Sequence, residues 1–357
     1  MKQWTTLMDG IDNLKLEISP DPVELKEDEV LVKISCVSLN NRDLQLITGA
    51  FKNRYGALEN AIVPCSDASG TVVRVGGPIA GSRLKEGDRV FSLARSNHLT
   101  GPMLPENAAA GIGIPLPGVL TQYRVFSEAG LVRTPDYMSD EEACTLTIAA
   151  TTAWMALNWD RPIGSPRRGK DVLVCLQGTG GVSIAALQQA HALGLTTVVT
   201  SSSDSKLEKT RRLGADHVIN YKKTPDWDKE VLRLANGRGA DIIVETGGPG
   251  TMDKSLSCVA HGGTVSAVGI LTGLMDEGAG KAQVAVGMRL IQRNASLKGI
   301  NIGPRDRVEE MMNLVYERSS VHPVIDRIFG FADVKAALEH LQSGSHFGKV
   351  VVRVNDD

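Results

Sequence analysis

The chain has 357 residues, which is enough for two domains with separate hydrophobic cores. Its formal net charge is only −2 and no block of like charges occurs, so nucleic acid and membrane surfaces are excluded as principal partners. No apolar run approaches the length that spans a bilayer, and the N-terminal MKQWTTLMDG lacks the apolar core of a signal peptide. We therefore expect a cytoplasmic protein that acts on a small molecule.

The five cysteines are odd in number, widely scattered and mostly set in apolar segments. This usage is typical of reduced thiols in a core rather than of a disulfide framework. No Cys-x-x-Cys or His-x-x-x-His pair occurs, so nothing local indicates a metal site.

The first third of the chain predicts an all-β domain. Glycine, proline, asparagine and aspartate turns separate the expected strands at 29–37, 70–76, 88–93 and 118–126. Residues 95–117 show no sustained period and many Gly, Pro and Ala, which predicts a long surface loop of the kind that often contacts substrate. From Ser139 the pattern becomes helical.

After Lys170 the expected strands and helices alternate, which indicates a doubly wound parallel sheet. The strands are expected at 172–176, 196–200, 217–221, 241–248 and 263–269. Beyond about residue 300, two helices and a closing strand are expected to return to the first domain, at 308–317, 334–343 and 348–354. The predicted division is therefore 1–148 plus 301–357 for the first domain and 149–300 for the second.

Residues 172–203, VLVCLQGTGGVSIAALQQAHALGLTTVVTSSS, predict a strand, a glycine-rich turn, a helix and a second strand. The glycines permit a turn whose backbone can approach a pyrophosphate, and the free N–H groups of the following helix would face the phosphates. Ser183 replaces the last glycine of a GxGxxG pattern, but the surrounding βαβ unit supports a dinucleotide site. The expected contacts are Gly178, Thr179, Gly180, Gly181 and Val182.

The second strand of this unit ends in Ser201, where an NAD site normally has a carboxylate for the ribose 2′-hydroxyl. Ser201, Ser202, Ser203 and Lys206 can instead donate hydrogen bonds and a positive charge to a 2′-phosphate. The serines can also cap the next helix, with Asp204 in its first turn, and the two roles can coexist. We therefore expect NADP(H) rather than NAD.

The order of these segments resembles the medium-chain dehydrogenase/reductase superfamily. The resemblance covers essentially the whole chain and rests on EVLVKISCVSLNNRDL, PCSDASGTVVRVG, LKEGDRVF, AATTAW, GTGGVS, LGADHVINY, GGTVSAVG and HFGKVVV. It implies an α/β fold class, with a GroES-like β domain plus a Rossmann doubly wound parallel sheet. It also implies hydride transfer between a nicotinamide and a carbonyl or activated alkene.

The zinc positions of that family's alcohol dehydrogenases are changed in this chain. The glycine frame of Gly70 and Gly76 is kept, but Ser66 stands where the resemblance places a ligand histidine. The other ligand positions fall near Asn40 and Ile148, neither of which binds zinc in the usual way, and no four-cysteine lobe occurs. The chain therefore resembles the zinc-independent quinone oxidoreductase and enoyl reductase branch, and we expect no metal.

The resemblance implies further contacts with the cofactor. Tyr221 and Lys206 match residues that contact the 2′-phosphate in quinone oxidoreductases. The other expected contacts are Gly247 on the adenosine side, Val268, Gly269, Ile270 and Thr152 along the nicotinamide, and Lys349 near the pyrophosphate. Simpler alternatives are a strand-end aromatic for Tyr221, a solvated helix face for Lys206, bonding to its own helix for Thr152, and an exposed strand-end lysine for Lys349.

The catalytic candidates are Asn41 and Thr152. Zinc-free relatives often place a tyrosine at the position of Asn41, whose amide cannot give up a proton as a general acid. Asn41 can orient a substrate oxygen by hydrogen bonding, while the proton comes from water or another side chain. Arg42 and Asp43 are expected to form an internal ion pair that fixes the loop.

These patterns together predict an NADPH-dependent, zinc-independent oxidoreductase acting on an activated alkene or a quinone-like substrate. Two alternatives stay open: a zinc-type alcohol dehydrogenase in which Cys65 and Asp67 find a distant histidine, and an NADPH-binding protein without redox chemistry.

The substrate pocket is expected to be set by the loops at 45–60, 95–117 and 272–290. Tyr55 and His98 lie in such loops, and for each an exposed loop position is the favoured reading. A homodimer is expected from the resemblance, with the GTVSAVG strand where relatives pair their sheets.

Overall fold

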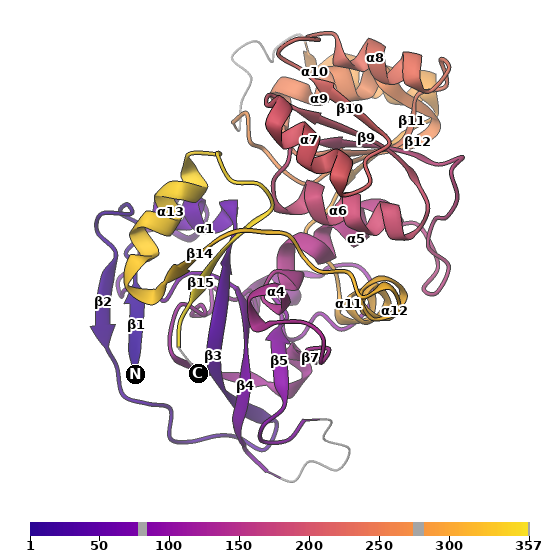
Figure 1. The fold of residues 1–357 in the computed structure, drawn as a ribbon. Helices are drawn as coiled ribbons and strands as arrows, with labels where there is room; N and C mark the ends of the chain where they lie inside the picture. Colours follow the sequence, from indigo (N-terminus) through magenta and orange to yellow (C-terminus); the bar gives the residue numbers. More distant parts are fainter. Residues whose placement is uncertain (78–83, 274–281, 356–357) are drawn as a thin grey trace. The chain divides into compact units, whose positions relative to one another are not determined.

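The structure, a computed structural model, describes residues 1–77, 84–273 and 282–355 (Figure 1). The chain divides into two compact units. The first comprises Met1–Thr151, Pro304–Glu309 and His322–Asp357, and the second comprises Thr152–Gly303 and Glu310–Val321. Within the described ranges, no helix is both long and apolar enough to cross a membrane.

A seven-stranded sheet forms the frame of the first unit. Its order is β14-β15-β3-β4-β5-β7, with β6 paired to β3, and only the β14–β15 pair is parallel. The strands are β3 (Glu29–Leu39), β4 (Asp67–Val75), β5 (Arg89–Ser92), β6 (Tyr123–Ser127), β7 (Leu131–Arg133), β14 (Ile325–Gly330) and β15 (Lys349–Arg353). Apolar side chains of the central strand β3, including Val32, Ile34 and Val37, lie in the hydrophobic core of this unit.

Two glycines, Gly70 in β4 and Gly76 directly after it, are required by the close approach of neighbouring backbone. A Cβ atom at Gly70 would lie 2.1 Å from the carbonyl oxygen of Lys33, and one at Gly76 would lie 1.7 Å from that of Lys26. Either distance is a severe clash, so no side chain fits at these positions. The glycine frame is therefore a packing requirement of the β3–β4 pair, whether or not a metal is bound nearby.

The remaining elements of Met1–Thr151 in the first unit are short. They are β1 (Lys2–Thr5), β2 (Lys15–Ile18), α1 (Asn41–Ile47), α2 (Lys52–Tyr55), α3 (Pro105–Ala109), η1 (Glu128–Gly130), α4 (Asp140–Ala143) and the π-helical η2 (Leu146–Ala150). Near the C-terminus the unit adds η4 (Phe331–Asp333) and α13 (Val334–Gln342).

The segment 95–117 is only partly the surface loop that its composition predicts: residues 99–102, 104–106 and 115–117 are exposed, but others are buried. Ile112 and Ile114 are buried because their side chains join the apolar clusters of the first unit. His98 is buried as well, with Nε2 3.1 Å from the carbonyl oxygen of Gly101, so the expectation of an exposed loop histidine is wrong. Tyr55 is half-buried and contacts the ring of Phe51.

The second unit contains a six-stranded parallel sheet, as the alternating pattern predicts. Its order is β10-β9-β8-β11-β12-β13, so the chain winds outward from β8 in one direction and from β11 in the other. The strands are β8 (Leu173–Gln177), β9 (Thr196–Ser201), β10 (His217–Asn220), β11 (Ala240–Glu245), β12 (Val259–Ala267) and β13 (Ser296–Gly299). All five residues of β8 are buried, which explains its continuous apolar run.

Among the described residues, five helices connect these strands: α6 (Gly181–Ala192), α7 (Asp204–Arg212), α8 (Trp227–Leu234), α9 (Pro249–Cys258) and α10 (Ala282–Arg293). Helix α5 (Thr151–Asn158) precedes β8, and α11 (Arg305–Met311), η3 (Met312–Tyr316) and α12 (Glu317–Ser319) follow β13. Helix α6 ends just before Gly194, whose φ of +71° cannot continue a right-handed helix. All five cysteines of the chain are free and buried, as predicted.

Three features differ from the sequence-based expectations. The GTVSAVG strand belongs to β12, which is paired on both sides, so a second subunit cannot extend the sheet there. The edge strand is β13, a short polar strand that the sequence pattern does not reveal.

Residues 310–321 belong to the second unit, where the Glu310 carboxylate accepts hydrogen bonds from Trp154 Nε1 at 2.9 Å and from Gly164 N at 2.7 Å. Within the predicted loop 272–290, residues 274–281 lie outside the described residues and the rest includes the start of α10.

Candidate functional site

The parallel sheet of the second unit brings the predicted nucleotide-binding residues to one edge. The carboxyl ends of neighbouring parallel strands meet at the same edge, and ligands of such sheets bind where the strand order reverses, here between β8 and β11. The residues that follow the strands at this edge are Gly178 after β8, Ser202 after β9, Tyr221 after β10, Gly247 after β11 and Val268 after β12.

The turn between β8 and α6 has the backbone that a pyrophosphate requires. Gly178 has a φ of +74°, with no atom within 4 Å of the position of a Cβ, and Gly180 is extended before α6 begins at Gly181. The first N–H groups of this 12-residue helix have no acceptor within the helix, so they can bind a phosphate. Ser183, which replaces the third glycine, turns its hydroxyl back to the carbonyl oxygen of Gln177. These residues fit a dinucleotide.

Ser203 caps the helix that follows β9. Ser203 Oγ accepts the N–H of Lys206 at 3.4 Å, and Ser201 Oγ accepts that of Ser203 at 3.3 Å. A hydroxyl that accepts such a bond keeps its own proton to donate, so capping by itself does not prevent these groups from binding an anion. Ser203 Oγ also lies 2.9 Å from Ser205 Oγ, and either hydroxyl can be the donor of that bond. Tyr221 is 41% exposed and its N–H donates to the carbonyl oxygen of Ser201 at 3.1 Å, which fixes the two strand ends together.

A buried carboxylate that the sequence analysis missed organises this edge. Glu245 is fully buried at the end of β11. Its oxygens accept hydrogen bonds from the N–H groups of Gly247 and Gly248, the hydroxyls of Thr251 and Ser255, and Nε2 of Gln177. Because Gln177 immediately precedes Gly178, the network ties the phosphate turn to the loop after β11. The signal in the sequence was an acidic residue that closes an apolar strand and is separated from two glycines by Thr246 alone.

The loop after β12 is held by the end of β11. The N–H groups of Val268 and Gly269 donate to the main-chain oxygen of Glu245 at 2.9 and 3.3 Å. These two donors are therefore already engaged within the protein, while Ile270 is 37% exposed. Thr152 is buried near the start of α5, and its neighbour Thr151 donates its hydroxyl to the carbonyl oxygen of Leu146 at 3.0 Å.

The first unit contains a buried charged cluster around Asp67 and Lys349. Lys349 Nζ donates to the carbonyl oxygen of Leu39 and to Oδ1 of Asn40, each at 2.7 Å, and lies 3.9 Å from Asp67 Oδ2. The Asp67 carboxylate also accepts from Asn40 Nδ2 at 2.9 Å and from Ser38 Oγ at 3.2 Å. Burial raises the pKa of Asp67 and lowers that of Lys349, and their mutual attraction opposes both shifts. The alternative of an exposed strand-end lysine at position 349 is therefore wrong, and a contact of Lys349 with the pyrophosphate stays a prediction.

Arg42 and Asp43 form the predicted internal ion pair, with Nη1 3.7 Å from Oδ1. Arg42 also donates to Ser66 Oγ at 2.9 Å and to the carbonyl oxygen of Ile112 at 3.1 Å. Asp43 accepts the N–H of Asn40 at 2.8 Å, and burial raises its pKa to about 6. The pair therefore fixes the start of α1, where Asn41 is the first helical residue and is exposed.

The positions that match zinc ligands do not fit zinc. Asn40 is engaged by Lys349 and Asp67, Ser66 by Arg42, and Ile148 has no donor atom. Burial raises the pKa of the Cys65 thiol well above its usual range. Across 1–77, 84–273 and 282–355, no group of three or more His, Cys, Asp or Glu side chains could hold a metal ion.

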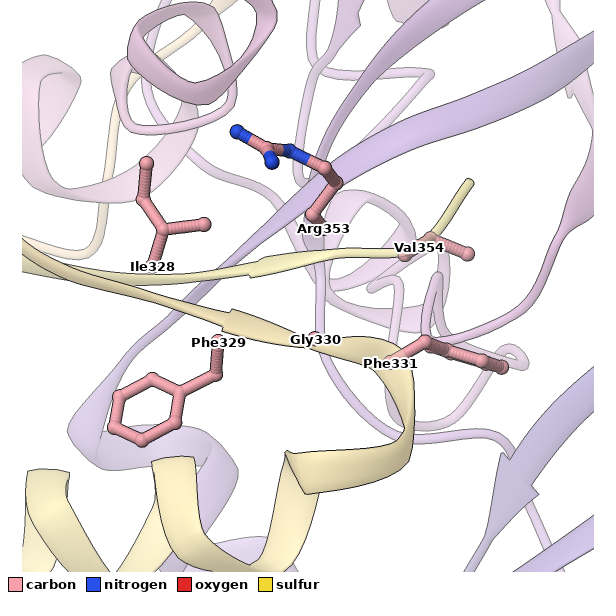
Figure 2. Close-up of a pocket in the computed structure, with 6 residues that line it drawn as sticks. All are labelled: Ile328, Phe329, Gly330, Phe331, Arg353 and Val354. Carbon is pink, nitrogen blue, oxygen red and sulfur yellow. The ribbon is translucent and has the colours of Figure 1, made fainter. Parts of the chain in front are cut away.

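A surface pocket of the first unit lies apart from these residues. Figure 2 shows it at the ends of β14 and β15, with Ile328 and Arg353 projecting to one side of the strands and Phe329 to the other. Arg353 is engaged by Glu141, with Nη2 2.6 Å from Oε1. None of the predicted site residues lines this pocket, so we assign it no role.

Two family models match the chain. Residues 26–136 match the alcohol dehydrogenase GroES-like domain, and residues 181–317 match the zinc-binding dehydrogenase model. A zinc-type alcohol dehydrogenase-like protein of Schizosaccharomyces pombe is 37% identical over 346 residues, which cover 97% of this chain and 96% of that protein. The chain belongs to the medium-chain dehydrogenase/reductase superfamily. It has the GroES-like and Rossmann domains of that superfamily, and it is an NAD(P)-dependent oxidoreductase.

Two further relatives of this superfamily are informative. The chloroplastic NADPH-dependent alkenal/one oxidoreductase of Arabidopsis thaliana is 32% identical, over 99% of this chain and 79% of that protein. A crystal structure from Sinorhizobium meliloti 1021, provisionally named an alcohol dehydrogenase, has a TM-score of 0.84 and 37% identity, covering 99% of this chain and 98% of that one. The roles of the individual residues in this chain stay predictions.

Proposed function

We propose that this superfamily member is an NADPH-dependent, zinc-independent reductase that transfers hydride to an activated alkene or a quinone-like acceptor. The observation that carries the proposal is the charged cluster of the first unit, in which Asn40 and Ser66 occupy zinc-ligand positions and are engaged by Lys349 and Arg42. Without a Lewis acid to stabilise an alkoxide, oxidation of a simple alcohol is disfavoured. A conjugated acceptor, by contrast, takes hydride at a carbon that is already electrophilic.

The preference for NADPH is supported by the edge of the second unit. Ser201 stands where an NAD-specific site has a carboxylate, and the donors of Ser202, Ser203, Lys206 and Tyr221 suit a 2′-phosphate. The relative from Arabidopsis thaliana named as an NADPH-dependent alkenal/one oxidoreductase supports both the cofactor and the acceptor class. Gly178 to Val182 would hold the pyrophosphate, and Gly247, Val268 to Ile270 and Thr152 would flank the rest of the dinucleotide.

When bound, the cofactor supplies a hydride from C4 of its nicotinamide. The protein contributes position and electrostatics: the loops tied by Glu245 hold the dinucleotide, and Asn41 can donate its amide N–H to a substrate oxygen as negative charge develops there. Because an amide does not release a proton, water would deliver the proton that completes the reduction. Lys349, held rigidly beside Asn40, adds a fixed positive charge to that part of the first unit.

We also propose that the protein is a cytoplasmic homodimer. A partner would pair through the exposed edge strand β13 of the parallel sheet, since β12 is covered on both sides.

The proposed function is tested with enzyme dialysed against a chelator and checked for zinc by elemental analysis. NADPH oxidation is followed with enones, enoyl thioesters, quinones, aldehydes and simple ketones, with and without added zinc. We expect turnover with an enone or quinone and no gain from zinc. Activity that needs stoichiometric zinc would support an alcohol dehydrogenase, and tight NADPH binding without turnover would support a non-redox role.

A further inference from the structure

An acidic side chain lies in the region that would receive the 2′-phosphate. Asp204 directly follows Ser203 and is the first residue of α7. A carboxylate there repels a phosphate, just as the acidic residue of an NAD site does. On charge alone Asp204 would favour NADH and oppose the proposed preference of this enzyme for NADPH.

The structure pairs this carboxylate with two donors from the neighbouring strand and its turn. Asp204 Oδ1 accepts a hydrogen bond from Asn220 Nδ2 at 2.7 Å, and Oδ2 lies 2.6 Å from Lys223 Nζ. Both donors belong to the segment at the end of β10, where Asn220 lies opposite Ser201 in the sheet. Arg211, near the other end of α7, attracts the Asp204 carboxylate more weakly and in the same direction.

We propose that Asn220 and Lys223 mask Asp204 and thereby let this edge of the sheet accept a 2′-phosphate. The inference rests on the proposed use of NADPH and names residues that set the choice of cofactor. Lys223 cancels the charge of the carboxylate, and Asn220 turns one of its oxygens toward β10. The serines and Lys206 can then bind an anion without a competing negative charge beside them.

Lys222 offers a matched control. It is exposed and adjacent to Lys223 in sequence, and it carries the same charge, but the contact that it makes to Asn220 is through its main-chain N–H. A general gain in positive potential would depend on both lysines equally. Of these two lysines, only Lys223 takes part in the masking, and its effect requires that Asp204 be charged.

The test measures binding of two ligands that differ only in the 2′-phosphate, 2′,5′-ADP and 5′-AMP, to the full-length protein by titration calorimetry. We expect Lys223→Gln to reduce the preference for 2′,5′-ADP about fivefold, the order of effect of one exposed charge pair. Lys222→Gln should change the preference less than about twofold, and Asp204→Asn in the Lys223→Gln background should restore it. Because these side chains are exposed, thermal unfolding should show that all variants fold.

Two outcomes would overturn the inference. If Lys223→Gln/Asp204→Asn loses as much of the preference for 2′,5′-ADP as Lys223→Gln does, then Lys223 binds the phosphate itself and does not act by masking Asp204. If Lys222→Gln reduces the preference for 2′,5′-ADP as much as Lys223→Gln does, the preference depends only on the overall positive potential of this edge. Failure of the proposed function is a different result, in which the unaltered protein shows no preference for 2′,5′-ADP.

Discussion

Single side chains decide the electrostatics of the buried cluster in the first unit. Asp43 and Asp67 are both completely buried, and Arg42 and Lys349 lie close enough to offset their charges. Isolated buried charges cost several kcal/mol, roughly 3–5 when a partner is removed. The cluster should therefore respond strongly both to pH and to loss of one member.

Asp43→Asn tests the response to pH. Burial raises the pKa of Asp43 from 3.8 to about 6 in the folded state, so the folded state binds the proton more tightly than the unfolded state. The resulting stabilisation is complete below about pH 4 and is lost as pH rises through 6, with a total on the order of 2–3 kcal/mol. Asparagine cannot titrate, so the difference in unfolding free energy between wild type and variant should fall over that range.

Urea unfolding of both proteins from pH 4 to pH 7 measures that difference, and it cancels the titration of all other groups. A difference that does not change with pH would mean that Asp43 ionises normally in the folded protein.

Lys349→Met tests the loss of one charge. The variant removes the donor to Leu39 and Asn40 and leaves Asp67 without its cation, so we expect a loss of about 3–5 kcal/mol in unfolding free energy. Lys349→Met/Asp67→Asn removes both charges and should be more stable than the single variant. Equal stability of Lys349→Met and wild type in denaturant would contradict the buried pair.

The sequence was informative about some of these residues and not about others. The adjacent opposite charges of Arg42 and Asp43 predicted an ion pair, and the structure contains it. The burial of Lys349 was not predictable, because its partner Asp67 and its acceptor Leu39 lie some 300 residues away along the chain and meet it only through the β15–β3–β4 pairing.

At the scale of elements, the Gln177–Glu245 pair joins the ends of β8 and β11. Glu245→Gln would set an amide against the Gln177 amide, leaving buried donors without acceptors. We expect NADPH affinity to fall about tenfold or more, because each such donor costs roughly 1–3 kcal/mol. The Michaelis constant for the cofactor should rise more than the turnover number falls.

Gln177→Glu/Glu245→Gln provides the control. It exchanges the two side chains and restores one carboxylate and one amide to the pair, so fluorescence titration with NADPH should recover most of the affinity. If the exchanged protein is no better than Glu245→Gln, the pair does not position the loops in the way its hydrogen bonds indicate.

Elements with strong local signals were predicted well. Strand β8, the turn at Gly178 and helix α6 follow directly from an apolar run, three glycines and helical spacing. Strand β13 was missed because SLKG is short, polar and exposed, and it is a strand only because β12 offers it an open edge. The buried part of 95–117 was also missed, since its apolar residues follow no regular period.

At the scale of the whole molecule, the edge strand β13 should govern assembly. Leu297 is 38% exposed in the middle of this strand. If two copies pair there, Leu297→Asp should weaken the dimer about tenfold or more by placing like charges near the two-fold axis. Analytical ultracentrifugation over a concentration series measures this, and a wild-type protein that is monomeric throughout would refute the homodimer.

The overall architecture was accessible from the sequence because local pattern and global topology agree across most of the chain. The type of reaction was harder to predict from the sequence than the fold. It depends on what replaces the zinc ligands, and the sequence reveals the substitutions at Asn40 and Ser66 but not the cations that engage them.

The most direct test of zinc-independent hydride transfer to a conjugated acceptor uses NADPH carrying two deuterium atoms at C4 of the reduced nicotinamide. Metal-free enzyme is mixed with this cofactor and an α,β-unsaturated ketone, and the product is analysed by NMR. We expect a saturated ketone with deuterium at the β-carbon and a solvent proton at the α-carbon. An allylic alcohol with deuterium at the former carbonyl carbon, or NADPH that binds and transfers no deuterium, would contradict the proposed function.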